Sequence, residues 1–196
     1  MTKIKMCGLR RAVDIEYANA LLPDFIGYVF AEKSRRYVTP ETAVELNKKL
    51  DKRIATVGVF VNATIEDVIN IAKSAVKIVQ LHGNENEEYI ARIHAENITV
   101  IKAFIVKSAK DIELAQKSTA DFVLLDAGMG DGRTFNHKLL NNMTRPYFLA
   151  GGLSPDNIAD ALKNNPYAVD VSSGIETDGF KDFIKMKKFT DLIRKD

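Results

Sequence analysis

Two short motifs in the last quarter of the chain contain the residues of a phosphate site. The apolar run 147–150 stops at Gly151-Gly152, and Ser154-Pro155 is typical of a helix start. Glycines before a helix let the backbone approach an anion, which the free N–H groups and the helix dipole attract. A second apolar run, 168–171, ends in Ser172-Ser173-Gly174, with two hydroxyls and backbone donors. Either motif alone is explained by a turn or a polar loop, but together they predict a phosphate site.

A cysteine and an aspartate at the ends of two other apolar runs could act as base and acid. Cys7 precedes a glycine; a lone cysteine is usually an inert buried thiol, but a phosphate loop and an arginine nearby would favour its thiolate. Asp126 follows the apolar run 122–125. It could orient the next loop, or desolvation could raise its pKa and make it a general acid. An acid and a base at one site would suit isomerisation by proton transfer.

Further polar residues stand near the ends of the apolar runs. Arg36 could form a surface salt bridge or clamp a carboxylate through two hydrogen bonds. His82 could bond within its loop, and no second histidine at ligand spacing supports a metal site. Lys102 is a Schiff-base candidate, although pairing with a buried acid is the favoured interpretation. We expect Gln80, His82 and Asp170 to join Arg36 in binding a substrate.

The elements that must position these residues alternate regularly. Apolar runs without polar alternation predict eight parallel strands buried on both faces, near residues 4–7, 25–30, 54–61, 78–81, 100–106, 122–126, 147–150 and 168–171. Amphipathic stretches between them predict helices near residues 12–22, 40–52, 64–74, 85–95, 108–117, 137–142, 154–163 and 181–194.

Eight strands alternating with eight helical segments fit either a closed (β/α)₈ barrel or an open doubly wound sheet. No G-x-G-x-x-G or Walker-type loop follows the first strand, which weakens the open nucleotide-binding sheet. The phosphate motifs follow strands seven and eight, as in (β/α)₈ barrels. We therefore predict an α/β fold, a compact TIM barrel with trimmed loops, in which residues 1–196 form one catalytic domain.

The composition is that of an ordinary globular protein, with 46% hydrophobic and 28% charged residues. The formal net charge of +2 gives no reason to expect a nucleic acid or a membrane as partner. One cysteine excludes an intramolecular disulfide and a multi-cysteine metal site. We see no signal peptide and no bilayer-spanning run, so a cytoplasmic location is expected.

Several motifs occur in the same order from the first strand to the last and resemble those of the phosphoribosylanthranilate isomerase family. They are Lys5-Met6-Cys7-Gly8-Leu9, Ser34-Arg35-Arg36-Tyr37-Val38, Val57-Gly58-Val59-Phe60-Val61-Asn62, Val79-Gln80-Leu81-His82-Gly83, Leu125-Asp126, Ala150-Gly151-Gly152-Leu153-Ser154-Pro155-Asp156-Asn157 and Val169-Asp170-Val171-Ser172-Ser173-Gly174-Ile175-Glu176. The first and last of these are the most specific.

This resemblance implies an Amadori rearrangement of N-(5′-phosphoribosyl)anthranilate in tryptophan biosynthesis, without a cofactor or a metal. It implies that Asp126 is the general acid, that Cys7 is the general base and that Arg36 contacts the anthranilate carboxylate. Backbone N–H groups around Gly151-Gly152 and Ser173-Gly174 would hold the phosphate. A monomer and a homodimer are both compatible with such a barrel.

One segment departs from the family pattern. After strand six the family usually has Gly-Gly-x-Gly-x-x-Phe-Asp-Trp, whereas residues 128–137 are shorter and end in Asn136-His137. Because this loop would cover the substrate, we expect some difference in turnover or binding. Three alternatives remain open: an epimerase-like barrel with metal-binding histidines and aspartates, an indole-glycerol phosphate synthase-like barrel with a lysine–glutamate pair, and an inactive barrel that binds a phosphorylated ligand.

Overall fold

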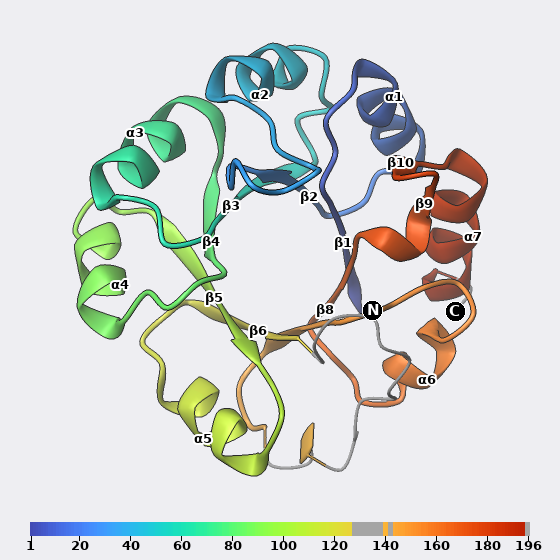
Figure 1. Ribbon diagram of the computed structural model, residues 1–196. Helices are drawn as coiled ribbons and strands as arrows, with labels where there is room; N and C mark the ends of the chain where they lie inside the picture. The colour runs from blue at the N-terminus through green and yellow to red at the C-terminus, as the bar shows by residue number, and fades with distance from the viewer. Residues whose placement is uncertain (127–138, 141–142, 195–196) are drawn as a thin grey trace.

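Eight parallel strands close into a barrel in the computed structural model, which describes residues 1–126, 139–140 and 143–194. Each strand pairs with the next along the chain, and the last pairs with the first (Figure 1). The strands are β1 (Lys3–Cys7), β2 (Phe25–Val29), β3 (Ala55–Phe60), β4 (Ile78–Leu81), β5 (Thr99–Ile105), β6 (Phe122–Asp126), β7 (Tyr147–Ala150) and β8 (Ala168–Val171). The predicted barrel is confirmed.

Helices surround the barrel and cover its outer face (Figure 1). They are α1 (Ala12–Leu21), α2 (Pro40–Asn47), α3 (Ile65–Ala75), α4 (Glu87–His94), α5 (Ala109–Lys117), α6 (Ile158–Leu162) and α7 (Phe183–Ile193). Within the described part of the chain, none of these helices combines the length and the apolar character needed to cross a bilayer. Four of the six residues of the helix predicted at 137–142 lie outside the described residues.

All seven described helices differ from their predicted bounds by at least one residue, and the largest differences are in α2 and α6. Helix α2, expected over 40–52, ends at Asn47, because the next amides bond three residues back and Asn47 is anchored by the Tyr28 hydroxyl and the Ala75 carbonyl. The helix expected over 154–163 begins only at Ile158. The helix expected over 181–194 begins at Phe183, because residues before it form a small antiparallel hairpin of β9 (Glu176–Thr177) and β10 (Phe180–Lys181).

Apolar side chains form two layers, one on each face of the barrel wall. The inner cluster fills the barrel with residues such as Phe25, Leu124 and Phe148. The larger outer cluster packs strand residues such as Ile4 and Met6 of β1 against the helices. Since successive side chains on a strand point to opposite faces, Lys5 and Cys7 point into the barrel.

Candidate active site

A cavity of about 770 Å³ opens at the carboxyl ends of the strands, and this volume suits a small-molecule ligand. All the residues predicted to form the site line this cavity except Gly174. They are Cys7, Arg36, Gln80, His82, Asp126, Gly151, Gly152, Asp170, Ser172 and Ser173. The fold thus brings together side chains from both ends of the chain.

The loops after β7 and β8 interlock at one side of the cavity. A Cβ atom on Gly174 would lie 1.9 Å from the Leu153 carbonyl oxygen, so only glycine permits this contact. Gly174 therefore joins the two loops instead of lining the cavity. The Ser172 hydroxyl donates a hydrogen bond to the Cys7 carbonyl oxygen at 3.0 Å. This bond ties the loop after β8 to the end of β1.

The prediction that a helix begins at Ser154, with its dipole directed at the anion, is wrong. Helix α6 has only five residues and starts at Ile158, after a turn rather than at Ser154. The turn is held by Asn157, whose side chain accepts from the Ser154 amide and donates to the Gly152 carbonyl, both at 2.9 Å. Any anion at Gly151-Gly152 would therefore meet the amides of a turn.

Cys7 lies at the end of β1, with its side chain almost buried at 8% exposure. The thiol has room because Gly27 faces it from β2, where an added Cβ would lie 2.7 Å from the sulfur. Burial raises the pKa of Cys7, and Asp170 raises it further, while Lys5 and Lys181 act in the opposite direction. The net direction is upward, because the burial of the thiol outweighs the cations that favour its thiolate.

A carboxylate and three cations form a network beside Cys7. Glu176 accepts two hydrogen bonds from Arg36, from Nε at 2.7 Å and from Nη2 at 2.8 Å, and a third from Lys181 at 2.7 Å. Arg35 approaches the same carboxylate at 3.2 Å. Although burial raises the pKa of Glu176, its bonds to Arg36 and Lys181 outweigh this effect and lower it overall. Arg36 therefore forms a largely buried salt bridge rather than a surface one, and the carboxylate that it bonds through two hydrogen bonds in this structure is that of Glu176.

Asp126 lies across the cavity on β6, next to His82. The two side chains approach to 3.5 Å between His82 Nε2 and Asp126 Oδ2. The other imidazole nitrogen lies 2.8 Å from Gln80 Nε2. If Gln80 Nε2 donates this bond, His82 Nδ1 is the acceptor and Nε2 carries the proton toward Asp126. The arrangement links three of the predicted site residues in one chain of contacts.

Three charged residues of this region were not predicted to belong to the site. Lys5 is fully buried inside the barrel and bonds both oxygens of Asp170, at 2.9 and 3.0 Å. The signal available in the sequence was a lysine two positions before Cys7 in an apolar strand. Glu176 and Lys181 come from the hairpin, whose signal was Asp178-Gly179, a typical two-residue hairpin turn.

Lys102 pairs with Glu85 at 2.9 Å and also donates to the Gly83 carbonyl oxygen at 2.7 Å. The favoured interpretation, a lysine paired with a buried acid, is confirmed. Among the residues that the structure describes, no group of three or more His, Cys, Asp or Glu side chains is arranged to hold a metal ion.

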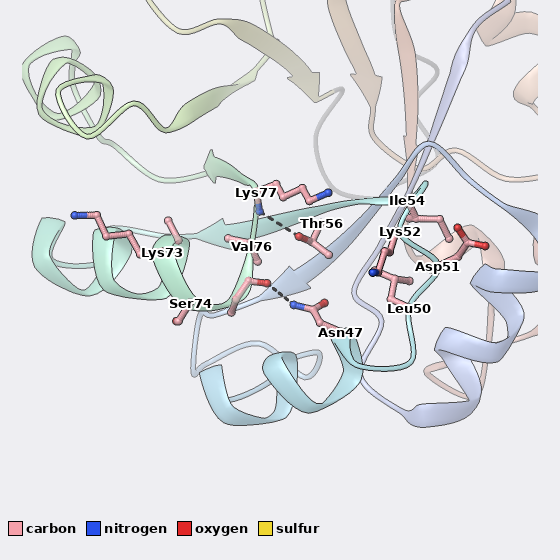
Figure 2. A pocket seen from close by; sticks show the side chains of 12 residues that line it. Asn47, Leu50, Asp51, Lys52, Ile54, Thr56, Lys73, Ser74, Val76 and Lys77 are labelled. Carbon is pink, nitrogen blue, oxygen red and sulfur yellow. Dashed lines mark hydrogen bonds between the residues drawn. The ribbon is translucent and has the colours of Figure 1, made fainter.

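A second cavity, of about 420 Å³, lies at the opposite end of the barrel, where β3 and β4 begin (Figure 2). Its polar side chains bond to the backbone: the Thr56 hydroxyl accepts from the Lys77 amide at 3.1 Å, and Asn47 donates to the Ala75 carbonyl at 2.6 Å. These bonds stabilise loops, so the candidate active site is the cavity at the carboxyl ends.

The chain is similar to known proteins over nearly its whole length. The family model described as N-(5′-phosphoribosyl)anthranilate (PRA) isomerase matches residues 4–192. A protein of that name from Thermoanaerobacter pseudethanolicus is 45% identical, covering 99% of this chain and 98% of its own. One from Clostridium acetobutylicum is also 45% identical, covering 100% and 99%.

Solved structures show the same likeness. The phosphoribosyl anthranilate isomerase from Thermotoga maritima matches with a TM-score of 0.91 and 35% identity, covering 100% of both chains. A structure of such an isomerase in complex with reduced 1-(o-carboxyphenylamino)-1-deoxyribulose 5-phosphate matches with a TM-score of 0.89, 35% identity and the same coverage. The barrel, the cavity and these full-length matches show that the chain belongs to the N-(5′-phosphoribosyl)anthranilate isomerase family.

Proposed function

We propose that this protein is the isomerase of tryptophan biosynthesis that converts N-(5′-phosphoribosyl)anthranilate into 1-(2-carboxyphenylamino)-1-deoxyribulose 5-phosphate. The observation that carries the proposal is the placement of Cys7 and Asp126 on one cavity, beside the glycine and serine loops that follow β7 and β8. The names of the relatives support it, as does the complex of a similar isomerase with a reduced product.

In this proposal Asp126 is the general acid. It donates a proton to the ribose ring oxygen, the C1′–O bond breaks, and the lone pair of the aniline nitrogen forms an iminium with C1′. Asp126 is 22% exposed and has His82 beside it. His82 Nε2 would then face the carboxylate that remains after proton transfer, and an N–H at this atom would stabilise it.

Cys7 is the proposed general base. Its thiolate takes the proton from C2′, and the electrons of that C–H bond form a C1′–C2′ double bond, which neutralises the iminium. The enolamine then tautomerises to the ketone. Because the substrate has an anionic group at each end, fixing both ends would hold the ribose over Cys7 and Asp126.

Other cavity residues would hold the substrate in place. Arg36 has one guanidinium nitrogen, Nη1, that Glu176 does not engage, and this nitrogen would bind the anthranilate carboxylate. Gln80 Oε1 is buried without a hydrogen-bond partner among the described residues, so a substrate donor would satisfy it. Asp170 would accept from a ribose hydroxyl. Gly151, Gly152 and Ser172-Ser173-Gly174 would surround the phosphate.

The test is to follow loss of substrate fluorescence in wild type, Asp126→Asn and Cys7→Ala. Loss of a general acid or base lowers kcat by about 10²- to 10⁴-fold. We expect a loss of this size in both variants, while the reduced product analogue still binds. Near-wild-type kcat in Asp126→Asn would show that Asp126 is not the general acid. The same result for Cys7→Ala would show that Cys7 is not the general base. An inactive wild type that binds the analogue would favour a non-catalytic ligand binder.

The domain organisation, the class of ligand, the location and the oligomeric state are also part of the proposal. We infer that residues 1–196 are one catalytic domain, that the protein binds a phosphorylated small molecule and that it works in the cytoplasm as a monomer or a homodimer. Support for either state comes from the Thermotoga maritima isomerase, which is described as dimeric and has also been solved as monomers.

A further inference from the structure

The buried ion pair between Lys5 and Asp170 lies directly beneath the proposed base. Lys5 and Cys7 are two residues apart on β1, so both side chains point into the barrel. Asp170 is the residue opposite Lys5 where β8 pairs with β1 and closes the barrel (Figure 1). Cys7 and Asp170 line the cavity, while the Lys5 side chain is 0% exposed below them.

Such a pair is an expensive feature in a barrel interior, where apolar side chains would pack without a desolvation penalty. Many other inner positions of the barrel are apolar, including Phe25, Leu124 and Ala168. We therefore expect the ion pair to have a role other than stabilising the barrel. The position of Lys5 supplies one, because its ammonium group is bonded to Asp170 and its charge lowers the pKa of the neighbouring Cys7 thiol.

We propose that Lys5 is a positioning residue for proton transfer at Cys7: its ammonium group, held in place by Asp170, stabilises the thiolate that removes the C2′ proton. This inference rests on the proposed role of Cys7 as the base. Asp170 acts in two ways, since it fixes Lys5 and at the same time opposes the negative charge on sulfur.

Two other cations lie near Cys7, but Lys5 has the larger effect on its pKa. Lys181 on β10 and Arg36 after β2 also favour a negative sulfur. Both bond the carboxylate of Glu176 at 2.7 Å, as Lys5 bonds the carboxylate of Asp170. Lys5 lowers the pKa of Cys7 more than Lys181 does. It thereby opposes the burial of the thiol, which raises this pKa.

Two substitutions are expected to shift the pKa of Cys7 in opposite directions. Lys5→Met removes the cation, so the pKa of Cys7 rises; Asp170→Asn removes the anion, so it falls. A neighbouring charge moves a pKa by about 1 to 3 units, which corresponds to at least about a tenfold change in the thiolate fraction at neutral pH. A purely structural role for the ion pair would not produce shifts in opposite directions.

The measurement is the pH profile of alkylation by iodoacetamide, which reports the thiolate directly because Cys7 is the chain's one cysteine. The matched control is Lys3→Met, which removes a β1 lysine that contacts the rings of Phe25 and Tyr167. We expect its alkylation profile to match wild type. If Lys5→Met fails to fold, Asp170→Asn alone decides, because an unchanged or raised pKa of Cys7 would overturn the inference.

The pH profile of kcat separates this inference from the proposed function. If both are correct, kcat in Lys5→Met is low at neutral pH and recovers at higher pH, in parallel with alkylation. An alkylation profile identical to wild type overturns the inference and leaves Cys7 as the base. Alkylation that shifts without any shift in kcat overturns Cys7 as the base, and with it the role of Lys5 in proton transfer.

Discussion

At the scale of single residues, Glu85 joins the ends of three neighbouring strands. Its carboxylate accepts from the Asn62 amide after β3, at 2.7 Å, and from the Gly83 amide after β4, at 2.9 Å. The charge is balanced by Lys102 of β5, and both side chains are nearly buried. Because His82 directly precedes Gly83, this pair also supports one wall of the candidate active site.

Lys102→Met is expected to lower the free energy of unfolding strongly, because Glu85 would remain charged and buried without its partner. Removing one member of a buried pair costs about 3–5 kcal/mol. The control is Lys73→Met, which breaks the exposed Lys73–Glu96 pair on the surface. Exposed pairs contribute about 0–1 kcal/mol. Urea unfolding measures both variants, and similar small losses in the two would contradict the importance of the buried pair.

At the scale of elements, two loops each have a glycine with left-handed backbone angles. Gly152 lies after β7 with φ 64°, and Gly179 lies in the hairpin turn with φ 78°. A Cβ atom added at either glycine would have no other atom within 4 Å. The two positions therefore share the same backbone constraint, and only Gly152 lines the candidate active site.

Gly152→Ala and Gly179→Ala are expected to lose similar stability, about 1 kcal/mol each, from the left-handed conformation. Only Gly152→Ala should also weaken binding of the reduced product analogue, since its methyl group would occupy the space next to the backbone that the phosphate needs. Urea unfolding and calorimetric titration measure the two effects. Unchanged analogue affinity in Gly152→Ala would move the phosphate away from this loop.

At the scale of the whole molecule, buried carboxylates connect segments that are distant in the sequence, and this makes stability depend on pH. The pKa values of Glu85 and Glu176 are both below the ordinary 4.5: burial raises each, but hydrogen bonds, with Lys102 and with Arg36 respectively, outweigh it. A carboxyl group with a lowered folded pKa stabilises the protein fully above its unfolded pKa, and this contribution disappears as the pH falls.

We therefore expect the free energy of unfolding to decrease as the pH falls below 4.5. Asp170 has the opposite sign, since burial raises its pKa, and its contribution decreases as the pH rises. Urea unfolding across an acidic pH series, with wild type beside Glu85→Gln, measures this dependence. The variant should have a flatter slope, and Glu88→Gln, at an exposed position of α4, is the control. Identical slopes in all three proteins would show that Glu85 does not cause the acid sensitivity.

Apolar runs in the sequence predicted all eight barrel strands, and the polar and glycine residues near their ends include ten that line the cavity. Four strands, β4, β6, β7 and β8, have the predicted boundaries, because a strand buried on both faces must be apolar throughout and polar residues mark its end. The same rule identified Cys7 and Asp126 as residues at strand ends. Helix ends were less predictable: the Asn47 side chain bonds the distant Ala75 carbonyl, and the Asn157 side chain holds a turn where a helix start at Ser154 was expected.

The pairing of the charges, and their effect on the thiol, could not be read from the sequence and follow from the folded barrel. Lys5 meets Asp170 across 165 positions, and Arg36 meets Glu176 across 140. These contacts depend on the register in which β8 closes on β1 and on a hairpin folded back over the barrel. Local periodicity shows that a strand is buried but not which strand lies beside it. The burial that raises the pKa of Cys7, and the cations that oppose it, exist only after the barrel has closed.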